Sequence, residues 1–482
     1  MQIMAVGVLI IPTAGFLCLR GLYMNNRENM TTPIQPVIPA IASAAVWGSG
    51  QLINRQYIKG SLYLFAQLFF VFAELVTGNY ASASFSIRED GGFFLHGLWG
   101  IVTLGSKPRQ MTLAGLTDGD HSVILMINGI IASLIIIAFV MIYIINIRDA
   151  FLTRKRINEG YEILSSLEGI KQRWYSSFHY FILIPGLLLI VFLLVLPVIF
   201  SILIAFTNFS KGNLPPVNLL DWVGIRNFLD IFRMPVWSST FFSIFGWTFI
   251  WAVLATLSCY FAGLFQAVII NNKRVRFKKI WRGILILPWA IPGMVSLLVF
   301  RTMLNGQFGP ISQFLLDIGL TTERISWLSD PQNPNLAKVV ILVVNLWLGF
   351  PYFMALTTGV LTSMSKDILE AARVDGATPF QEFWRITFPM IFKVTSPLLI
   401  MGFAGNFNNF GVIYFLSGGG PGNANYQFAG STDILITWIY KLTIDHQFYN
   451  MAAVMSTMIF LIIGTISVWN FTRTRAFKED EV

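Results

Sequence analysis

Long apolar segments alternate with charged connections along almost the whole chain. A helix needs roughly 20 mostly apolar residues to cross a bilayer, and eight runs approach that length. They lie at about 60–78, 122–146, 178–206, 241–270, 283–303, 339–361, 394–416 and 450–471. The pattern therefore predicts an all-α, polytopic integral membrane protein with about eight transmembrane helices.

The composition agrees with this interpretation. Of the 482 residues, 55% are hydrophobic and only 12% are charged, and the mean hydropathy is +0.66. Such a chain has too few polar side chains to cover a water-soluble globular protein, so the soluble classes are excluded.

Basic residues occur in alternate connections between the apolar runs. The formal net charge of +9 could indicate nucleic acid or an anionic ligand, but the positive-inside rule explains the alternation better. The residues that mark the cytoplasmic side are Arg148, Arg154, Lys155, Arg156, Lys171, Arg173, Lys273, Arg274, Arg276, Lys278, Lys279, Arg282, Lys366, Arg373, Arg385, Arg473 and Arg475. They predict a multi-pass protein of the cytoplasmic membrane with a cytoplasmic C-terminus.

Three parts are expected along the chain: an N-terminal apolar segment with a helical hairpin (1–60), an accessory pair of transmembrane helices with an external loop and a cytoplasmic linker (61–177), and a main transmembrane domain (178–475). Residues 1–24 are apolar, yet no basic region precedes them and no small-residue cleavage site follows, so a cleaved signal peptide is not expected. An extra transmembrane helix and an extension from an upstream start both remain open. Residues 38–61 predict a helical hairpin or half-helix facing the cytoplasm, and 79–120 predict a polar, Gly-rich external loop.

The residue types of common metal and nucleotide sites are poorly represented. Cys18 and Cys259 both lie in apolar runs, where cysteine acts as a small buried hydrophobe. The histidines are scattered, without the spacing of metal ligands. No GxxxxGK[ST] phosphate loop occurs, so we expect no cofactor and no bound nucleotide in this chain.

One polar connection, EAARVDGATPFQEFWRITFP at 370–389, has the signals of a helix-turn-helix. Gly376 can adopt the left-handed conformation that ends a helix. Thr378 to Gln381 resembles a capping box, with Pro379 at the first helical position. The connection is either a structural re-entry loop or a docking surface for a soluble partner.

Polar residues also interrupt the run at 394–416. Gly402, Gly405, Asn406 and Asn409 share one stripe at helical spacing, while Asn408 points elsewhere. Amides in a spanning helix either hydrogen-bond to a neighbouring helix or line a cavity. A neutral polyol suits the second alternative, because amides bind hydroxyls without burying a charge.

Aromatic rings for sugar stacking are available at Trp289, Tyr352, Phe407 and Phe410. Glu74 is the main acidic residue within an apolar run, where a functional role and a polar contact with a neighbouring helix or headgroup are both open.

Together these motifs resemble the carbohydrate-uptake ABC permeases, in particular the MalF-type permease subunit of maltose/maltodextrin importers. The resemblance covers about 178–475. It rests on the segments Leu287 to Pro292, Asn345 to Tyr352, Glu370 to Gly376 (the EAA loop), Gly402 to Phe410, and Gly418 to Gly422.

The resemblance implies a six-helix ABC importer permease core that forms half of a translocation pore. It implies partners: a second, MalG-type permease, an extracytoplasmic sugar-binding protein, and two ATPase subunits that bind ATP and Mg. The transported sugar would be maltodextrin-like, or alternatively another oligosaccharide such as a raffinose-type sugar. The chain itself would be a transport subunit and not an enzyme.

The resemblance also implies roles for particular positions. Substrate-binding positions are Trp289, Leu348, Gly349, Tyr352, Asn406 and Asn409, and ATPase-coupling positions are Glu370, Ala371, Ala372 and Gly376. Trp289 stands where the family has tyrosine, and Gly293 and Gly402 stand where it has serines. The large extracytoplasmic insertion of some members is missing, so a binding protein would dock on shorter loops, including 207–240 and 417–447.

A membrane-embedded glycan enzyme is the rival hypothesis. It would need a carboxylate or base poised at a membrane face. Glu74 lacks a visible catalytic partner in the sequence, which disfavours this class.

Overall fold

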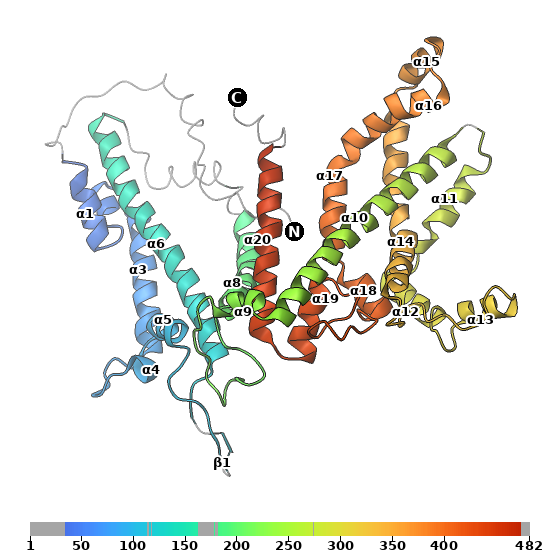
Figure 1. Cartoon of the computed structure of the whole chain (residues 1–482). Coiled ribbons are helices and arrows are strands. Elements are labelled where there is room, and N and C mark those ends of the chain that lie inside the picture. The colour runs from blue at the N-terminus through green and yellow to red at the C-terminus, as the bar shows by residue number, and fades with distance from the viewer. Residues whose placement is uncertain are drawn as a thin grey trace. The chain divides into compact units, whose positions relative to one another are not determined.

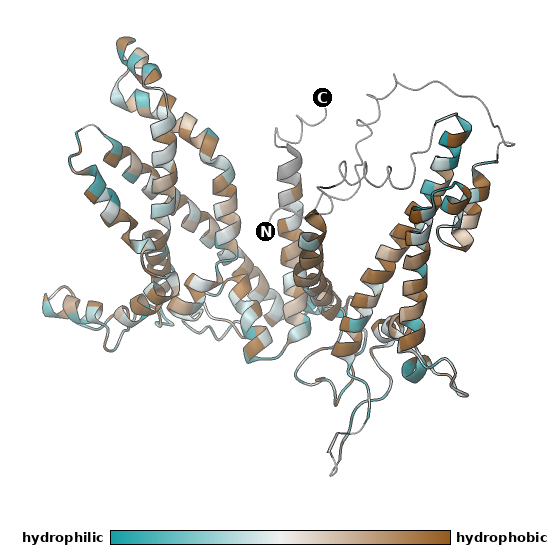
Figure 2. Ribbon diagram, turned by 180° about the vertical axis from the view of Figure 1, so that it is seen from behind, coloured by the Kyte–Doolittle hydropathy of each residue, from teal (hydrophilic) through white to brown (hydrophobic). Residues whose placement is uncertain are grey.

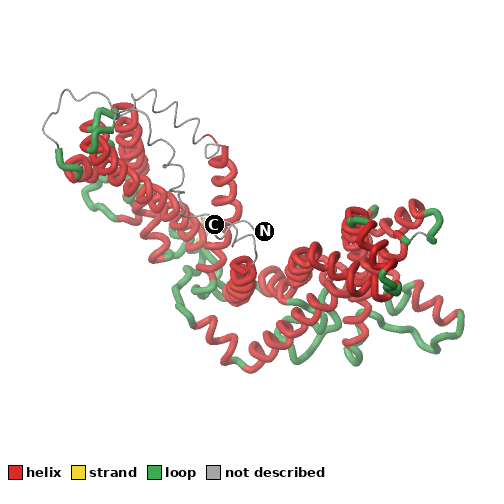
Figure 3. Tube along the Cα trace, turned by 90° about the horizontal axis from the view of Figure 1, so that it is seen from above, coloured by secondary structure: helices red, strands yellow, loops and turns green. Residues whose placement is uncertain are grey.

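The computed structural model describes residues 34–112, 115–116, 118–161, 178, 182–272 and 274–473. Helices joined by loops make up almost all of this part of the chain (Figure 3). The expectations for residues 1–24 and for Cys18, Lys171, Arg173, His179, Lys273 and Arg475 lie outside the described residues.

The chain divides into two compact units. Unit 1 comprises 1–203, 207–222 and 464–482, and unit 2 comprises 204–206 and 223–463. The described elements up to residue 204 are α1 (Val37–Ala45), α2 (Ser49–Ile53), α3 (Tyr57–Thr77), α4 (Ile87–Asp90), α5 (Phe93–Thr103), β1 (Met111–Thr112), β2 (Gly115–Leu116), α6 (Ser122–Asn158), the π-helical turn η2 (Val191–Val195) and α8 (Leu196–Ile204).

The remaining elements continue to the C-terminal helix. They are α9 (Arg226–Arg233), α10 (Pro235–Asn271), α11 (Lys278–Ile286), the 3₁₀ turn η3 (Leu287–Trp289), α12 (Gly293–Met303), α13 (Pro310–Asp317), α14 (Pro334–Ser363), α15 (Lys366–Val374), α16 (Pro379–Glu382), the π-helical turn η4 (Phe383–Thr387), α17 (Phe388–Phe407), α18 (Phe410–Ser417), α19 (Leu435–Tyr440), the π-helical turn η5 (Lys441–Asp445) and α20 (Tyr449–Arg473).

Most of the predicted membrane spans are present as helices. Within the described residues, six helices are long and apolar enough to cross a membrane: Tyr57–Thr77, Ser122–Asn158, Ile182–Ile204, Pro235–Asn271, Pro334–Ser363 and Pro379–Phe407. The apolar part of the last helix, Tyr449–Thr465, is shorter. Hydrophobic residues dominate the middle of the long helices, and hydrophilic residues gather toward several of their ends (Figure 2).

Two predicted spans differ from the structure. The run at 283–303 is not one straight helix, because it is bent by 83° between Lys278–Trp289 and Gly293–Met303. Pro288 and Pro292 explain the break, since proline lacks an N–H and clashes with the preceding turn. The run at 394–416 is also interrupted: α17 ends at Phe407, and α18 begins anew at Phe410.

In unit 1, α5 packs tightly on α6. A Cβ added at Gly129 would lie 2.4 Å from Cβ of Ile101, and one at Gly97 would lie 2.7 Å from Cβ of Ala132, so glycine allows the close approach. The region predicted as an external polar loop at 79–120 therefore also contains an apolar helix that covers α6.

Glu74 holds the start of α5. Its carboxylate accepts hydrogen bonds from the backbone N–H groups of Phe94 (2.7 Å) and Leu95 (3.2 Å) and from the hydroxyl of Tyr80. A carboxylate at a helix N-terminus satisfies otherwise unpaired donors and interacts favourably with the helix dipole. Of the two roles left open for Glu74, the structure shows the polar contact with a neighbouring helix.

Asp120 organises the polar segment before α6. It accepts from the backbone N–H groups of Ser106 (2.8 Å) and Lys107 (3.0 Å) and from Nε of Arg88 (3.1 Å). Burial alone would raise the pKa of Asp120. The combined effect of these hydrogen-bond donors and of the Arg88 charge is larger, so the pKa lies below its ordinary value.

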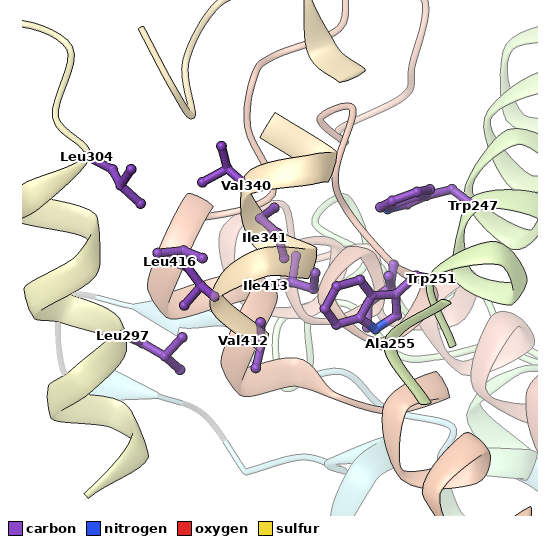
Figure 4. Close-up of a cluster of buried hydrophobic side chains, with 12 residues drawn as sticks. Trp247, Trp251, Ala255, Leu297, Leu304, Val340, Ile341, Val412, Ile413 and Leu416 are labelled. Carbon is purple, nitrogen blue, oxygen red and sulfur yellow. The ribbon is translucent and has the colours of Figure 1, made fainter. Parts of the chain in front are cut away.

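In unit 2, α10 and α14 form the central pair. A Cβ at Gly263 would lie 2.6 Å from the backbone nitrogen of Met354, so the two helices can cross this closely only at a glycine. The core beside this pair includes Trp251, Ile341 and Ile413, all fully buried (Figure 4).

The two ends of unit 2 carry different loops. The EAA loop, with α15 and α16, lies at one end of the helices, whereas α9, α13 and α19 lie at the opposite end (Figure 1). The spans of unit 2 therefore separate the EAA loop from the Gly418–Gly422 segment that precedes α19.

Candidate functional site

Two adjoining clefts open beside the middle of α14. One has a volume of about 440 Å³, and its lining includes five of the predicted binding residues: Leu348, Gly349, Tyr352, Asn406 and Asn409. The sixth, Trp289, lines the other cleft, of about 510 Å³, which shares Leu348, Asn409 and Val412 with the first. The structure thus brings all six positions together, and their role in binding stays a prediction.

The two cleft asparagines form a hydrogen-bonded relay. Nδ2 of Asn406 donates to Oγ1 of Thr256 (2.9 Å), and Nδ2 of Asn409 donates to Oδ1 of Asn406 (3.3 Å). Oδ1 of Asn409 accepts from the backbone N–H of Val412 (3.3 Å). Each amide nitrogen has a second hydrogen beyond these bonds, so the pair can serve both helix packing and ligand binding.

Asn409 lines the cleft from a different structural element than predicted. It is not on the same helical stripe as Gly402 and Asn406, because α17 ends before it, and Asn409 caps the N-terminus of α18. Asn408 sits at the break, is exposed, and donates to the backbone oxygen of Ala404 (3.4 Å). Asn408 is absent from the linings of both clefts, as predicted.

Trp289 and Tyr352 form the aromatic wall. Their rings stack with centroids 6.0 Å apart and planes at 29°, and Nε1 of Trp289 donates to the backbone oxygen of Leu348 (3.2 Å). Trp289 is 53% exposed and Tyr352 is 40% exposed, so both rings present surface for stacking. The bend of the 283–303 segment places Trp289 at this position.

Phe407 and Phe410 do not belong to this wall. Phe407 is only 5% exposed and packs against Phe245 and Phe403. Phe410 stacks on Tyr414, with ring centroids 4.7 Å apart. Neither residue lines the clefts, so the structure does not place their rings beside the other predicted binding residues.

Two residues of α10 take part in the site and were not anticipated from the sequence: Cys259 lines the cleft, and Thr256 accepts the hydrogen bond from Asn406. Cys259 is buried, as predicted, and its Sγ lies 3.6 Å from the backbone oxygen of Asn345. A Cβ at Gly349 would lie 2.6 Å from that Sγ, so Gly349 permits close packing of α14 on α10. Thr256 was detectable only as a polar residue within an apolar run.

The EAA loop has the predicted helix-turn-helix form. Oγ1 of Thr378 accepts from the backbone N–H of Gln381 (3.3 Å), and Oε1 of Gln381 accepts from the N–H of Thr378 (2.9 Å), which completes the capping box. Gly376 has φ of +81°. Glu370 and Ala371 are exposed, and Ala372 is partly exposed.

An ion pair joins the two helices of this loop. Nε and Nη2 of Arg373 donate to the two carboxylate oxygens of Glu382, both at 2.8 Å. A bidentate pair of this kind fixes orientation as well as distance. Local sequence patterns do not predict this pair, because nine residues and a turn separate the partners.

Apolar side chains are exposed on the same loop. Val374 is 87% exposed and Phe380 is 72% exposed. Together with the charged residues of α15 they form a surface with the mixed character of a protein interface.

At the opposite end, a buried carboxylate holds the Gly418–Gly422 segment. Asp433 is fully buried and accepts from the backbone N–H of Gly430 (2.7 Å) and from Nζ of Lys441 (2.6 Å). A Cβ at Gly419, where φ is +81°, would lie 2.0 Å from Oδ1 of Asp433. Glycine is therefore required at this position for the loop to close over the carboxylate.

Several long apolar helices, a cleft of neutral polar groups at mid-span and an exposed helical hairpin at one end define a membrane transport protein. Within the described residues, no group of three or more His, Cys, Asp or Glu side chains is placed to hold a metal ion.

The sequence is similar to known membrane transport proteins over most of its length. Residues 259–474 match the family described as "Binding-protein-dependent transport system inner membrane component". The galactooligosaccharides transport system permease protein GanP of Bacillus subtilis is 36% identical over 444 residues, which cover 92% of this chain and 98% of that protein. The maltodextrin transport system permease protein MalC of Streptococcus pneumoniae is 35% identical, with 96% and 100% covered.

A solved structure shares the fold. It is a bacterial ABC transporter involved in the import of the acidic polysaccharide alginate, with a TM-score of 0.52 and 23% sequence identity, and it covers 64% of this chain and 98% of its own. The chain belongs to the family of inner-membrane permease components of binding-protein-dependent transport systems. It is thus a transport subunit rather than an enzyme.

Proposed function

We propose that this chain forms half of the pore of an ATP-driven importer of neutral oligosaccharides, of the maltodextrin or galactooligosaccharide kind. The relatives that match almost its whole length are named for these two sugar classes. A raffinose-type sugar is the alternative, since it would need the same neutral hydrogen-bonding chemistry.

The cleft chemistry carries this proposal. None of the residues that line the two clefts is charged, so an anionic or cationic substrate would be buried without a partner there. Amides from Asn406 and Asn409 and the phenol of Tyr352 suit hydroxyl groups, and the Trp289 ring suits the apolar face of a sugar.

The EAA loop is proposed to couple this cleft to partner ATPases. α16, η4 and α17 follow one another from Pro379 to Phe407, about 40 Å at 1.5 Å per residue. A soluble subunit that moves the exposed Val374 and Phe380 surface would therefore move Asn406, near the other end of the same rod. Alternating access follows, with ATP and Mg bound by those partners and not by this chain.

The remaining partners and the orientation follow from the same scheme. A second permease would complete the pore, and an extracytoplasmic binding protein would deliver the sugar to loops that include 417–447. The basic residues of the EAA loop and of the α10–α11 connection support a cytoplasmic location for those segments and for the C-terminus, because positive charge is enriched on the cytoplasmic side.

Reconstitution of the whole complex tests the proposal. The chain, a second permease, the ATPases and a binding protein are placed in liposomes, and uptake of maltotriose, a galactooligosaccharide and raffinose is measured with and without ATP. We expect ATP-dependent uptake of one neutral oligosaccharide class. Uptake without ATP, selection of an anionic sugar, or chemical turnover of sugar by the chain alone would contradict it.

A charge swap tests the coupling loop. Arg373→Glu and Glu382→Arg should each weaken sugar-stimulated ATP hydrolysis, because α15 loses its orientation on α16. Arg373 is exposed and water screens the pair, so only a modest loss is expected. The double variant should recover most of the loss, whereas additive losses would show that the ion pair has no orienting role.

A further inference from the structure

The α1–α2 hairpin has a polar face toward the protein. Ser43 and Gln51 are fully buried, and Oγ of Ser43 donates to Oε1 of Gln51 (2.9 Å). Nε2 of Gln51 donates to the backbone oxygen of Asn146 (2.9 Å), and Nδ2 of Asn146 donates to the backbone oxygen of Ser43 (3.0 Å). A closed hydrogen-bond network therefore fixes the hairpin on α6.

The outward face of this hairpin is apolar. Val37, Ile38, Ile41 and Val46 are 49%, 52%, 64% and 48% exposed, and α1 contains no charged residue. A helix at a water surface shows the reverse arrangement, with its polar side outward. Apolar side chains outside and hydrogen-bonded polar side chains inside are what a hydrocarbon environment requires.

This apolar face continues into a spanning helix. The backbone oxygen of Gly60, in the first turn of α3, lies 2.0 Å from where a Cβ of Gly48 would be, so the hairpin rests directly on α3. Leu62, Phe65 and Phe72 of α3 are 63%, 67% and 64% exposed. The hairpin and α3, which both expose apolar side chains, are therefore in direct contact.

Basic side chains border the hairpin. Arg55 and Arg148 are exposed, and within the described part of the chain neither forms an ion pair. Arg55 follows Asn54, whose Nδ2 donates to the backbone oxygen of Ala150 of α6 (2.9 Å), and Arg148 lies two residues before Ala150 on α6. Nearby, Lys59 is paired with Asp149.

From these observations we propose that the hairpin is a re-entrant anchor in the cytoplasmic leaflet. Its outward face lies among acyl chains, and Arg55 and Arg148 bind anionic lipid headgroups at its edge. The proposal rests on the orientation proposed above, and it is independent of which sugar is transported.

Spin labels measure the environment of the hairpin directly. Ile41→Cys, in a Cys18→Ser background, is labelled with a nitroxide in the full transporter reconstituted in liposomes, and its collision rates with oxygen and with a water-soluble nickel chelate are compared. Leu68→Cys, in the middle of α3, gives the lipid reference, and Glu159→Cys, at the end of α6, gives the aqueous one. We expect position 41 to match position 68, with high oxygen and low nickel accessibility.

Other results would overturn the anchor. A label at position 41 that is accessible to nickel without the ATPases, and shielded only when they are bound, would make the face a protein interface. Low accessibility to both reagents would indicate contact with the second permease. Because these readouts do not use transport, failure of the proposed sugar specificity would leave them unchanged.

The binding of anionic headgroups by the two arginines can be tested by changing the lipid composition of the liposomes. The melting temperature of the transporter should rise when phosphatidylglycerol is added to phosphatidylcholine liposomes, because a ligand that binds only the folded state stabilises it. The Arg55→Gln/Arg148→Gln double variant should lose most of that rise, while Lys155→Gln, at an exposed position paired with Glu159, should retain it. An equal rise in both variants would contradict headgroup binding at this edge.

Discussion

The Gly376→Pro variant should abolish ATP-driven uptake while the subunit remains inserted and assembled with the second permease. Gly376 has φ of +81°, and proline fixes φ near −65°, so the turn between α15 and α16 cannot form. A proline that does not fit the backbone costs about 3 kcal/mol. A tenfold loss in affinity for the ATPases corresponds to only about 1.4 kcal/mol. Sugar-stimulated ATP hydrolysis, normalised to membrane abundance, is the measurement.

A graded series at the same position provides the control. Nothing lies within 4 Å of a Cβ added at Gly376, so Gly376→Ala meets only the cost of the left-handed conformation, about 1 kcal/mol. Gly376→Asn should lose less, because asparagine tolerates that conformation better. Equal activity across proline, alanine and asparagine would show that the turn has no part in coupling.

Glu370→Lys probes the chemistry of the same loop without changing its shape. Glu370 is exposed on α15, so reversing its charge should weaken ATPase docking and leave the fold of the loop intact. Normal uptake and normal ATP hydrolysis at normal expression would argue against α15 as the docking helix.

Local sequence signals correctly predicted the helix-turn-helix form of the EAA loop. Contacts between residues distant in the sequence could not be predicted in this way. The capping box at Thr378 and the left-handed Gly376 are set within a few residues, so the sequence identifies them. The Arg373–Glu382 pair depends on how two helices meet across the turn. Burial of Asp433 depends on the fold of a loop that hydrophobic periodicity does not describe.

The candidate cleft was predicted in composition but not in geometry. The apolar run at 394–416 continues through Asn408 without Gly or Pro at the break, so periodicity favoured one helix over two. Pro288 and Pro292 did signal an interruption, but the total length of the run favoured a span. Phe407 faces the core because α17 packs on α10, a tertiary contact that spacing alone does not determine.

Asn406→Ala and Asn409→Ala should reduce uptake of the oligosaccharide more than assembly of the complex. Each removes a neutral hydrogen-bonding group from the cleft, at about 0.5–1.5 kcal/mol, or up to roughly tenfold in affinity. Asn408→Ala is the internal control, because Asn408 is exposed and absent from the lining of both clefts. The three variants are compared by transport normalised to assembled complex.

The structural role of Asn409 needs its own control, because its side chain also caps α18. Loss of that cap costs about 1 kcal/mol of stability, and Asn409→Ala would combine this cost with any loss of sugar contact. Asn409→Ser retains a capping oxygen but lacks the amide donor that reaches Asn406. If the amides bind sugar, Asn409→Ser should assemble normally and still transport poorly. Full recovery of uptake by serine, or equal small defects at 406, 408 and 409, would show that the amides hold helices together and that the sugar path lies elsewhere.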